Sequence, residues 1–108
     1  MAAKTISEGR RVQGTAEVLH ERAGRLVGYL VSHNEEEAQA VTFYDSSSTS
    51  GTVLHKVWIP AGEVVYIRFG MSSAREEANI ERSAIPFSAG LAVDPGLCDV
   101  AVWAIGYG

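Results

Sequence analysis

The sequence predicts an all-β domain of short strands, and three observations favour this fold class. The chain contains twelve valines and six isoleucines, and branched side chains suit the half-buried surface of a sheet. Short apolar runs recur about every ten to twelve residues and are separated by turn residues, as in a sandwich or a barrel. No stretch keeps a sustained 3.6-residue apolar period, so a fold that alternates helices and strands is disfavoured.

Turn residues set the limits of each predicted strand. Ala23-Gly24 supplies the positive φ that a hairpin often needs, and Asn34–Glu37 is an acidic connection. Asp45–Gly51 is a loop of short polar side chains that can bond the backbone locally. Pro60–Gly62 and Asp94–Gly96 are tight turns, since proline lacks the N–H that a ladder requires. The eight predicted strands are Thr15–His20, Arg25–His33, Ala38–Tyr44, Thr52–Ile59, Glu63–Phe69, Ala84–Phe87, Leu91–Val93 and Asp99–Tyr107.

Residues 1–13 differ in composition from the rest of the chain. They carry the basic side chains Lys4, Arg10 and Arg11 and have little apolar content. Termini that are not tied down are usually mobile. We therefore expect residues 1–13 to form an N-terminal arm outside the core, and residues 14–108 to form a single β-sandwich domain.

A second segment, Met71–Arg82, also interrupts the strand pattern. Its Ser73-Ala74-Arg75-Glu76 has the spacing of a capping box, in which a serine and a glutamate satisfy each other's backbone donors at the start of a helix. One or two helical turns are predicted there, with an exposed loop as the equal alternative.

Composition excludes several classes of protein. A length of 108 residues is enough for one domain. A formal net charge of −4 argues against binding nucleic acid by neutralising phosphates. No apolar run approaches the ~18 residues of a membrane span, and the N-terminus lacks the apolar core of a secretory signal. Because Cys98 is the only cysteine, no intramolecular disulfide can form. We expect a soluble domain without disulfides.

The residues that usually carry chemistry are not arranged for it. His20, His33 and His55 are far apart and show no spacing typical of metal ligands. Cys98 precedes Asp99, whose negative charge disfavours a reactive thiolate, so a structural cysteine is predicted. The chain contains no Gly-x-Ser-x-Gly elbow and no phosphate-binding glycine loop. We therefore predict no catalytic, cofactor-binding or metal-binding residues, and no enzyme.

Most of the chain, from Arg25 to Tyr107, carries a recurring series of strand and turn motifs that ends in a closing strand through Trp103. They are Phe43-Tyr44-Asp45 with its Ser/Thr/Gly loop, Gly51–Leu54, Val57–Gly62, Val65–Phe69 and Ile85–Val93. This series resembles the small β-sandwich virion proteins of tailed bacteriophages, the capsid decoration (cement) class. The resemblance implies a compact jelly-roll-like sandwich without catalytic residues.

The resemblance implies a structural function. The leading hypothesis is a capsid decoration subunit on the exterior of the virion, made in the host cytoplasm, that binds the major capsid protein and stabilises contacts between capsid subunits. Lys4, Arg10 and Arg11 are its candidate contact arm. The alternatives are a tail or fibre module that binds a host-surface ligand, with the Asp45–Gly51 loop as its site, and a carbohydrate-binding or interaction module.

The last predicted strand is apolar on both faces. Val100, Val102 and Ala104 alternate with a second set, Ala101, Trp103, Ile105 and Tyr107. Thr52–Ile59 shows the same feature, with Val53, Val57 and Ile59 expected on one face and Leu54 and Trp58 on the other. A second apolar face has to be covered, either by another part of the chain or by a partner. We predict a homo-oligomer whose contact includes Trp103, Ile105 and Tyr107; a trimer is favoured because the resembling class often sits at three-fold positions.

Overall fold

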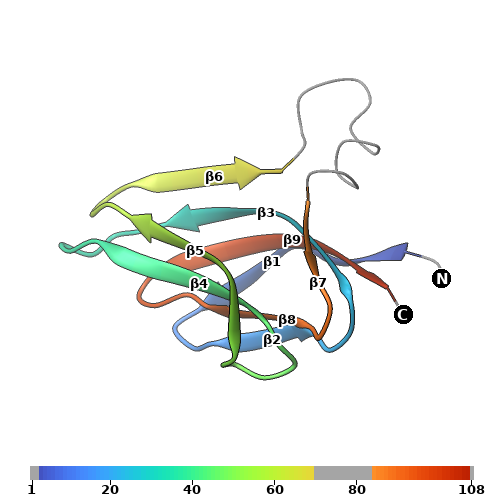
Figure 1. Ribbon diagram of the computed structural model, residues 1–108. Coiled ribbons are helices and arrows are strands. Elements are labelled where there is room, and N and C mark those ends of the chain that lie inside the picture. Colours follow the sequence, from blue (N-terminus) through green and yellow to red (C-terminus); the bar gives the residue numbers. More distant parts are fainter. Residues whose placement is uncertain (1–2, 70–83, 108) are drawn as a thin grey trace, which may run out of the picture.

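The protein is a sandwich of two antiparallel sheets (Figure 1). The computed structural model describes the backbone of residues 3–69 and 84–107, and the side chains of residues 9–69 and 84–106. Sheet 1 contains, in order, β1 (Ala3–Gln13), β9 (Asp99–Tyr107), β3 (Gly24–Ser32) and β6 (Val64–Arg68), with β7 (Ile85–Phe87) also paired to β3. Sheet 2 contains β2 (Glu17–His20), β8 (Leu91–Asp94), β4 (Gln39–Asp45) and β5 (Thr52–Ile59). The all-β sandwich prediction is confirmed.

All eight predicted strands are present, and their ends differ from the predicted ones by at most two residues. The turns account for this agreement. Gly62 and Gly96 have positive φ angles of 73° and 59°, and each lies in a tight turn that follows a proline. No helix among the described residues is long and apolar enough to cross a membrane. Met71–Arg82, where a helical turn or a loop was expected, lies outside the described residues.

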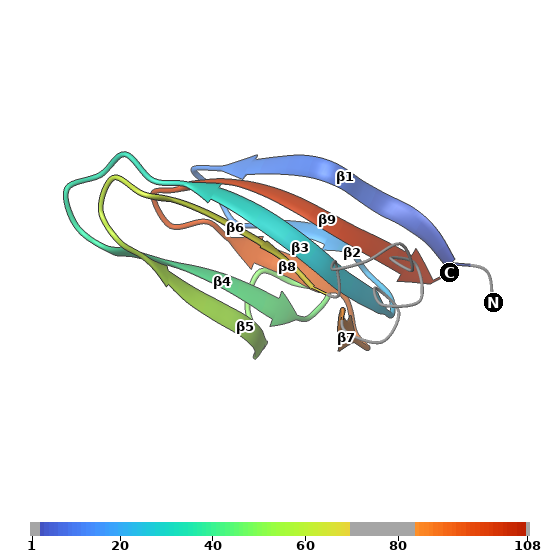
Figure 2. The same cartoon turned by 90° about the horizontal axis from the view of Figure 1, so that it is seen from above.

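The structure corrects the expectation that residues 1–13 lie outside the core. Residues 3–13 form β1, which pairs with β9 from Ala3 opposite Tyr107 to Gln13 opposite Asp99. Val12 of β1 is fully buried against the interior. The segment escaped prediction because an edge strand is held by backbone hydrogen bonds to one neighbour and can keep polar side chains. The first and last described residues, Ala3 and Tyr107, therefore lie side by side where β1 meets β9 (Figures 1 and 2).

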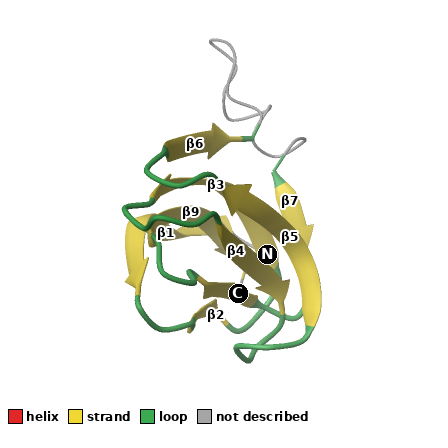
Figure 3. Ribbon diagram, turned by 90° about the vertical axis from the view of Figure 1, so that its left-hand side faces the viewer, coloured by secondary structure: helices red, strands yellow, loops and turns green. Residues whose placement is uncertain are grey.

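The strand pairs are nested from the termini inward. β1 pairs with β9, β2 with β8, β3 with β6 and β4 with β5, all antiparallel. Successive pairs fall in sheet 1 and sheet 2 alternately, as if one long ribbon were wound around the core (Figure 3). This is the arrangement of a jelly roll. The jelly-roll-like topology implied by the resemblance is present.

The core lies between the sheets and consists of the inward side chains of both. Aliphatic residues dominate it, and successive inward positions on β9 show the two-residue period of a strand. Two aromatic residues, Tyr29 and Phe43, join the sheets with their ring centroids 5.1 Å apart. The fully buried residues are Val12, Leu26, Val31, Val41, Phe43, Ile59, Leu91, Ala92, Val93, Val100 and Val102.

A hydrogen bond crosses the core from one sheet to the other. The hydroxyl of Tyr29 on β3 lies 3.0 Å from Nε2 of His55 on β5. Phe69 packs edge-on against both rings. Burial lowers the pKa of His55 and raises the pKa of Tyr29. The imidazole is therefore poorly suited to carry a charge in the folded state.

We expect β1 to be necessary for stability. Deleting residues 1–13 should lower the free energy of unfolding by more than ~2 kcal/mol, because it removes buried Val12 and leaves one edge of β9 unpaired. Urea denaturation followed by circular dichroism measures the change. An Arg10→Ala control, which breaks the exposed ion pair with Glu17, should cost less than ~1 kcal/mol. A truncated protein as stable as the full chain would contradict the pairing.

Acidification should destabilise the protein partly through His55. The folded-state pKa of His55 is lowered, so the folded state binds fewer protons than the unfolded state, and stability falls as the pH drops below ~6.5. In a His55→Phe variant, the loss of unfolding free energy between pH 7.5 and pH 5.5 should be smaller than in the wild type. His20 and His33 remain in both proteins, so the difference isolates His55. Equal losses would show that burial does not perturb this histidine.

Candidate interaction surfaces

The outer face of sheet 1 carries apolar side chains on three adjacent strands, with Arg68 of β6 and Arg25 of β3 on the same face. On β9 the residues between the buried ones point outward, and Ala101, Trp103 and Ile105 are half-buried. On β6, Val64 and Tyr66 are 65% and 54% exposed. Together with Leu30 of β3, we call Val64, Tyr66, Ala101 and Trp103 the sheet 1 surface.

Trp103 is held in place by contacts from both sides. The ring of Tyr66 meets it nearly at a right angle, at 77° and with 6.0 Å between ring centroids. On the other side its ring lies over the backbone of Gly9 in β1. These contacts provide part of the cover that the second apolar face of β9 was expected to need, but Tyr66 itself stays exposed.

Gly9 makes this position of the tryptophan ring achievable. It has a φ of +78° and lies where the β1–β9 register shifts between Glu8 and Arg10, which marks a β-bulge. A Cβ added to Gly9 would come within 3.1 Å of the Trp103 ring. Glycine is therefore required twice here, once for the backbone conformation and once for the space.

Beside Trp103 the same face is hollowed. A depression of about 200 Å³ is lined by small residues and an ion pair: Gly9, Arg11, Leu30, Ser32, Asp99 and Ala101. At its rim, the guanidinium of Arg11 donates two hydrogen bonds to the carboxylate of Asp99, at 2.8 and 2.5 Å. This hydrogen bonding and the charge of Asp99 raise the pKa of Arg11. The rim thus carries one cation and one anion.

The structure brings the predicted contact arm and the predicted self-association face of the last strand onto one sheet, because β1 and β9 are neighbours. Arg11 lies on the outer face, opposite Ala101. Arg10 has a different role, since it bonds Glu17 of β2 at 3.0 Å and so bridges the edges of the two sheets. The side chains of Lys4 and Tyr107 lie outside the described residues.

These ion pairs change the electrostatic interpretation of residues 1–13. The sequence suggested a basic arm, but Arg10 and Arg11 each have a carboxylate partner from a strand distant in sequence. Their attraction for an acidic partner is reduced accordingly. No local sequence signal could reveal this, because Asp99 is 88 residues away from Arg11.

The outer face of sheet 2 carries a smaller exposed surface around Trp58. This side chain is 63% exposed, and the ammonium of Lys56 lies 5.2 Å from the ring centroid. Val53 is also exposed, although the sequence placed it with inward Val57 and Ile59. A register shift between Phe43 and Tyr44 explains the correction: it pairs Val53 with Tyr44 and turns both outward. We call Val53, Lys56 and Trp58 the sheet 2 surface.

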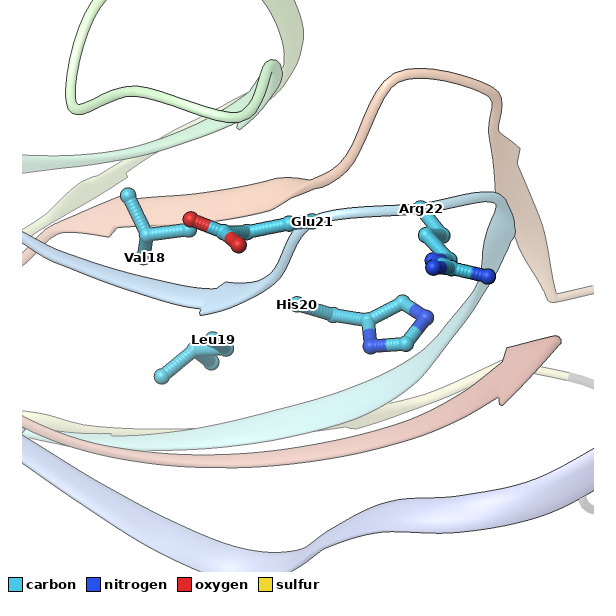
Figure 4. A pocket seen from close by; sticks show the side chains of 5 residues that line it. All are labelled: Val18, Leu19, His20, Glu21 and Arg22. Atoms are coloured by element: carbon cyan, nitrogen blue, oxygen red, sulfur yellow. The ribbon is translucent and has the colours of Figure 1, made fainter. Parts of the chain in front are cut away.

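Two further depressions are open to solvent. One of about 410 Å³ is lined by Val18–Arg22; Leu19 and His20 lie on the side of β2 that faces sheet 1, and Val18 lies on the other side (Figure 4). The ring of His20 packs edge-on against Phe87. The second, of about 460 Å³, is lined by Asn34–Glu37, Gln39 and Leu97.

The histidine beneath the second depression stabilises the loop. His33 is buried, its Nε2 lies 2.5 Å from the carbonyl oxygen of Glu37, and its Nδ1 accepts a hydrogen bond from the backbone of Glu35. Both nitrogens of the imidazole are thus used in hydrogen bonds. The ring shapes the acidic connection and has no nitrogen left for a ligand.

The remaining reactive groups also have structural partners. Cys98 is buried, and burial together with the charge of Glu35 raises the pKa of its thiol. Burial by itself would raise the pKa of Asp45, but hydrogen bonds from the backbone of Ala89 and Ser88 outweigh it and lower that pKa. Within residues 3–69 and 84–107 no group of three or more His, Cys, Asp or Glu side chains could hold a metal ion.

Fold and surfaces together define a small jelly-roll sandwich with an exposed apolar surface on each outer face. No protein-family model, curated protein or solved structure matches the chain.

We expect the contact between Gly9 and Trp103 to be measurable by comparing two glycines of equal φ. Gly9→Ala and Gly14→Ala should each cost roughly 1–2 kcal/mol of unfolding free energy for a side chain at positive φ. Gly9→Ala should cost more, because nothing lies within 4 Å of a Cβ on Gly14 whereas Trp103 must move for one on Gly9. Urea denaturation measures both, and tryptophan fluorescence should shift in Gly9→Ala only. Equal costs and unchanged fluorescence would refute the packing.

Proposed function

We propose that this protein is a bacteriophage capsid decoration subunit, which binds the outer shell of major capsid protein and stabilises contacts between capsid subunits. The observation that carries the proposal is that large exposed apolar side chains lie on both outer faces of one sandwich. A protein that bridges others needs at least two contact surfaces. The resemblance of the strand and turn motifs to virion decoration proteins supports the same function.

The rigidity of the scaffold suits a mechanical task. Each outer face belongs to a sheet whose other face packs against the core, so neither surface can fold inward to cover itself. Exposed apolar patches of this kind commonly mark association sites. A subunit that binds only the assembled shell stabilises that state by mass action.

We assign the shell contact to the sheet 2 surface. Trp58 is a large side chain that is mostly exposed, and tryptophan is the residue type that most often dominates the binding energy of an interface. Lys56 beside it adds a positive charge to a protein of net charge −4. The contact role of Lys4, Arg10 and Arg11 stays a prediction, which the intramolecular partners of the two arginines make less favourable.

Co-sedimentation with empty shells of the major capsid protein tests this assignment. Trp58→Ala should weaken shell binding by about thirtyfold, the effect of losing an anchor of ~2 kcal/mol. Leu97→Ala is the matched control, since Leu97 is also 63% exposed but lies near the acidic loop. It should leave the affinity unchanged.

Other outcomes would redirect the proposal. If Arg11→Ala weakens binding at low salt and Trp58→Ala does not, β1 makes the shell contact instead. If the wild-type protein does not co-sediment with shells but binds glycans of a host surface, a tail or fibre module is the better description.

A further inference from the structure

We propose that the side of β5 that faces away from β4 (the β5 edge) pairs with the β5 edge of a second copy of this chain, in a two-fold antiparallel dimer. Within the described residues β5 pairs with β4 alone, so the backbone N–H and C=O groups of the β5 edge have no strand partner there. Adding a strand to such an edge is a common way for proteins to bind an extended segment. The dimer does not rest on the proposed function.

Among the described edge strands, β5 is both long and regular. β2 has four residues, β6 and β7 share an edge with five and three, and β1 is bent by two register shifts. Short strands and bulges are the means by which proteins protect an edge from pairing. β5 has eight residues, and its register shift leaves only Leu54 without an opposite residue. His55–Ile59 is therefore a regular edge of five residues.

The side chains of the β5 edge match themselves in the antiparallel register centred on Val57. This register places Lys56 of each copy directly opposite Trp58 of the other, on the outer face of the joined sheet. Within one chain the Lys56 ammonium already lies 5.2 Å from the centroid of the Trp58 ring. The same cation–π contact can form between directly opposite residues of two strands. A lysine usually protects an edge by its charge, but here that charge would meet an aromatic ring.

The neighbouring registers are unfavourable. Residues directly opposite each other point to the same face, so the two cores stay on one side of the joined sheet only when the pairing is centred on a residue. Centred on Lys56, the pairing would set two ammonium groups directly opposite each other. Centred on Trp58, it would set Lys56 opposite Pro60, which has no N–H to donate. Centred on His55, it would run into the irregular Leu54.

Apolar side chains beside the β5 edge would be covered in the same dimer. β5 and β6 are consecutive strands joined by the Pro60–Gly62 turn, and they form facing edges of the two sheets (Figure 1). Ile67 points to the core side of β6, because it is opposite buried Tyr29, yet it is 37% exposed. Val65 on the same side of β6 is half-buried. Joining two copies at β5 brings their β6 strands next to each other and reduces the exposure of both residues.

The dimer leaves the outer face of sheet 2 open. Its two-fold axis is perpendicular to the joined sheet, so the sheet 2 surfaces of both copies face the same way. The proposed shell contact and the proposed dimer therefore do not compete. The dimer is measured without shells, so its failure is distinguishable from a failure of shell binding.

Cysteine cross-linking tests the register. Val57→Cys should give a disulfide-linked dimer on mild oxidation, because directly opposite residues of antiparallel strands have Cα atoms about 4.5–5.5 Å apart. Lys56→Cys is the matched control: this position is more exposed, but its two copies are diagonal and roughly 7–8 Å apart, too far for a disulfide. The natural Cys98 is buried. No cross-link at position 57, or an equal one at position 56, would overturn the proposal.

Sedimentation equilibrium between ~1 and ~100 μM tests the dimer itself. The wild-type protein should shift from one copy toward two across this range. Trp58→Lys should weaken dimerisation about tenfold, because each new ammonium would face Lys56 of the other copy. Leu97→Lys adds the same charge at a residue that is also 63% exposed but lies outside β5, and it should dimerise like the wild type.

A charge exchange separates the pairing from a general effect of Trp58. Adding Lys56→Glu to Trp58→Lys should restore the dimer, because each lysine would then face a glutamate of the other copy. Thermal unfolding at ~1 μM should be similar for Trp58→Lys and Leu97→Lys, since both positions are exposed in one chain. If Trp58→Lys fails to fold, the two cysteine variants decide. A wild-type monomer at ~100 μM, a mass of three copies, or a double variant that stays monomeric would each overturn the proposal.

Discussion

The pairing of the first strand with the last is the constraint on which the fold depends. β1 and β9 form the outermost of the nested antiparallel pairs. Their register therefore fixes how the N-terminal and C-terminal parts of the chain align. β9 in turn lies between β1 and β3 and contributes Val100 and Val102 to the core. Contacts between residues this distant in sequence are costly to form, because a long loop must close first. The stability of the sandwich is therefore concentrated in long-range contacts.

The sequence predicted much of the fold because strands and turns are local. Gly62, Gly96 and the prolines before them mark turns through backbone preferences that act within a few residues. The strand predicted at Thr52–Ile59, which ends just before Pro60, has the observed limits. β1 could not be predicted in this way. Its side chains are mostly polar, and what makes it a strand is the backbone of β9, which no pattern within residues 1–13 encodes.

The candidate surfaces were predictable only in part. Alternation along β9 correctly separated inward Val102 from outward Trp103, because a strand has a two-residue period. The same reasoning misplaced Val53, since the bulge that turns it outward arises from pairing with β4. The carboxylate partners of Arg10 and Arg11 depend on the meeting of distant strands as well. The periodicity of a strand predicts the sheet face on which a side chain lies, but the register between paired strands determines which residues it contacts.

The way β6 and β7 share the edge of β3 has a consequence for how this chain can change over evolution. β6 ends with Arg68 opposite Gly28, and β7 begins with Ile85 opposite Leu26, so the intervening segment leaves and rejoins the sheet two positions apart. Doubling the length of a loop between fixed ends costs only about 0.6 kcal/mol. Related chains can therefore acquire longer insertions or whole additional modules at this edge while the wound ribbon stays intact.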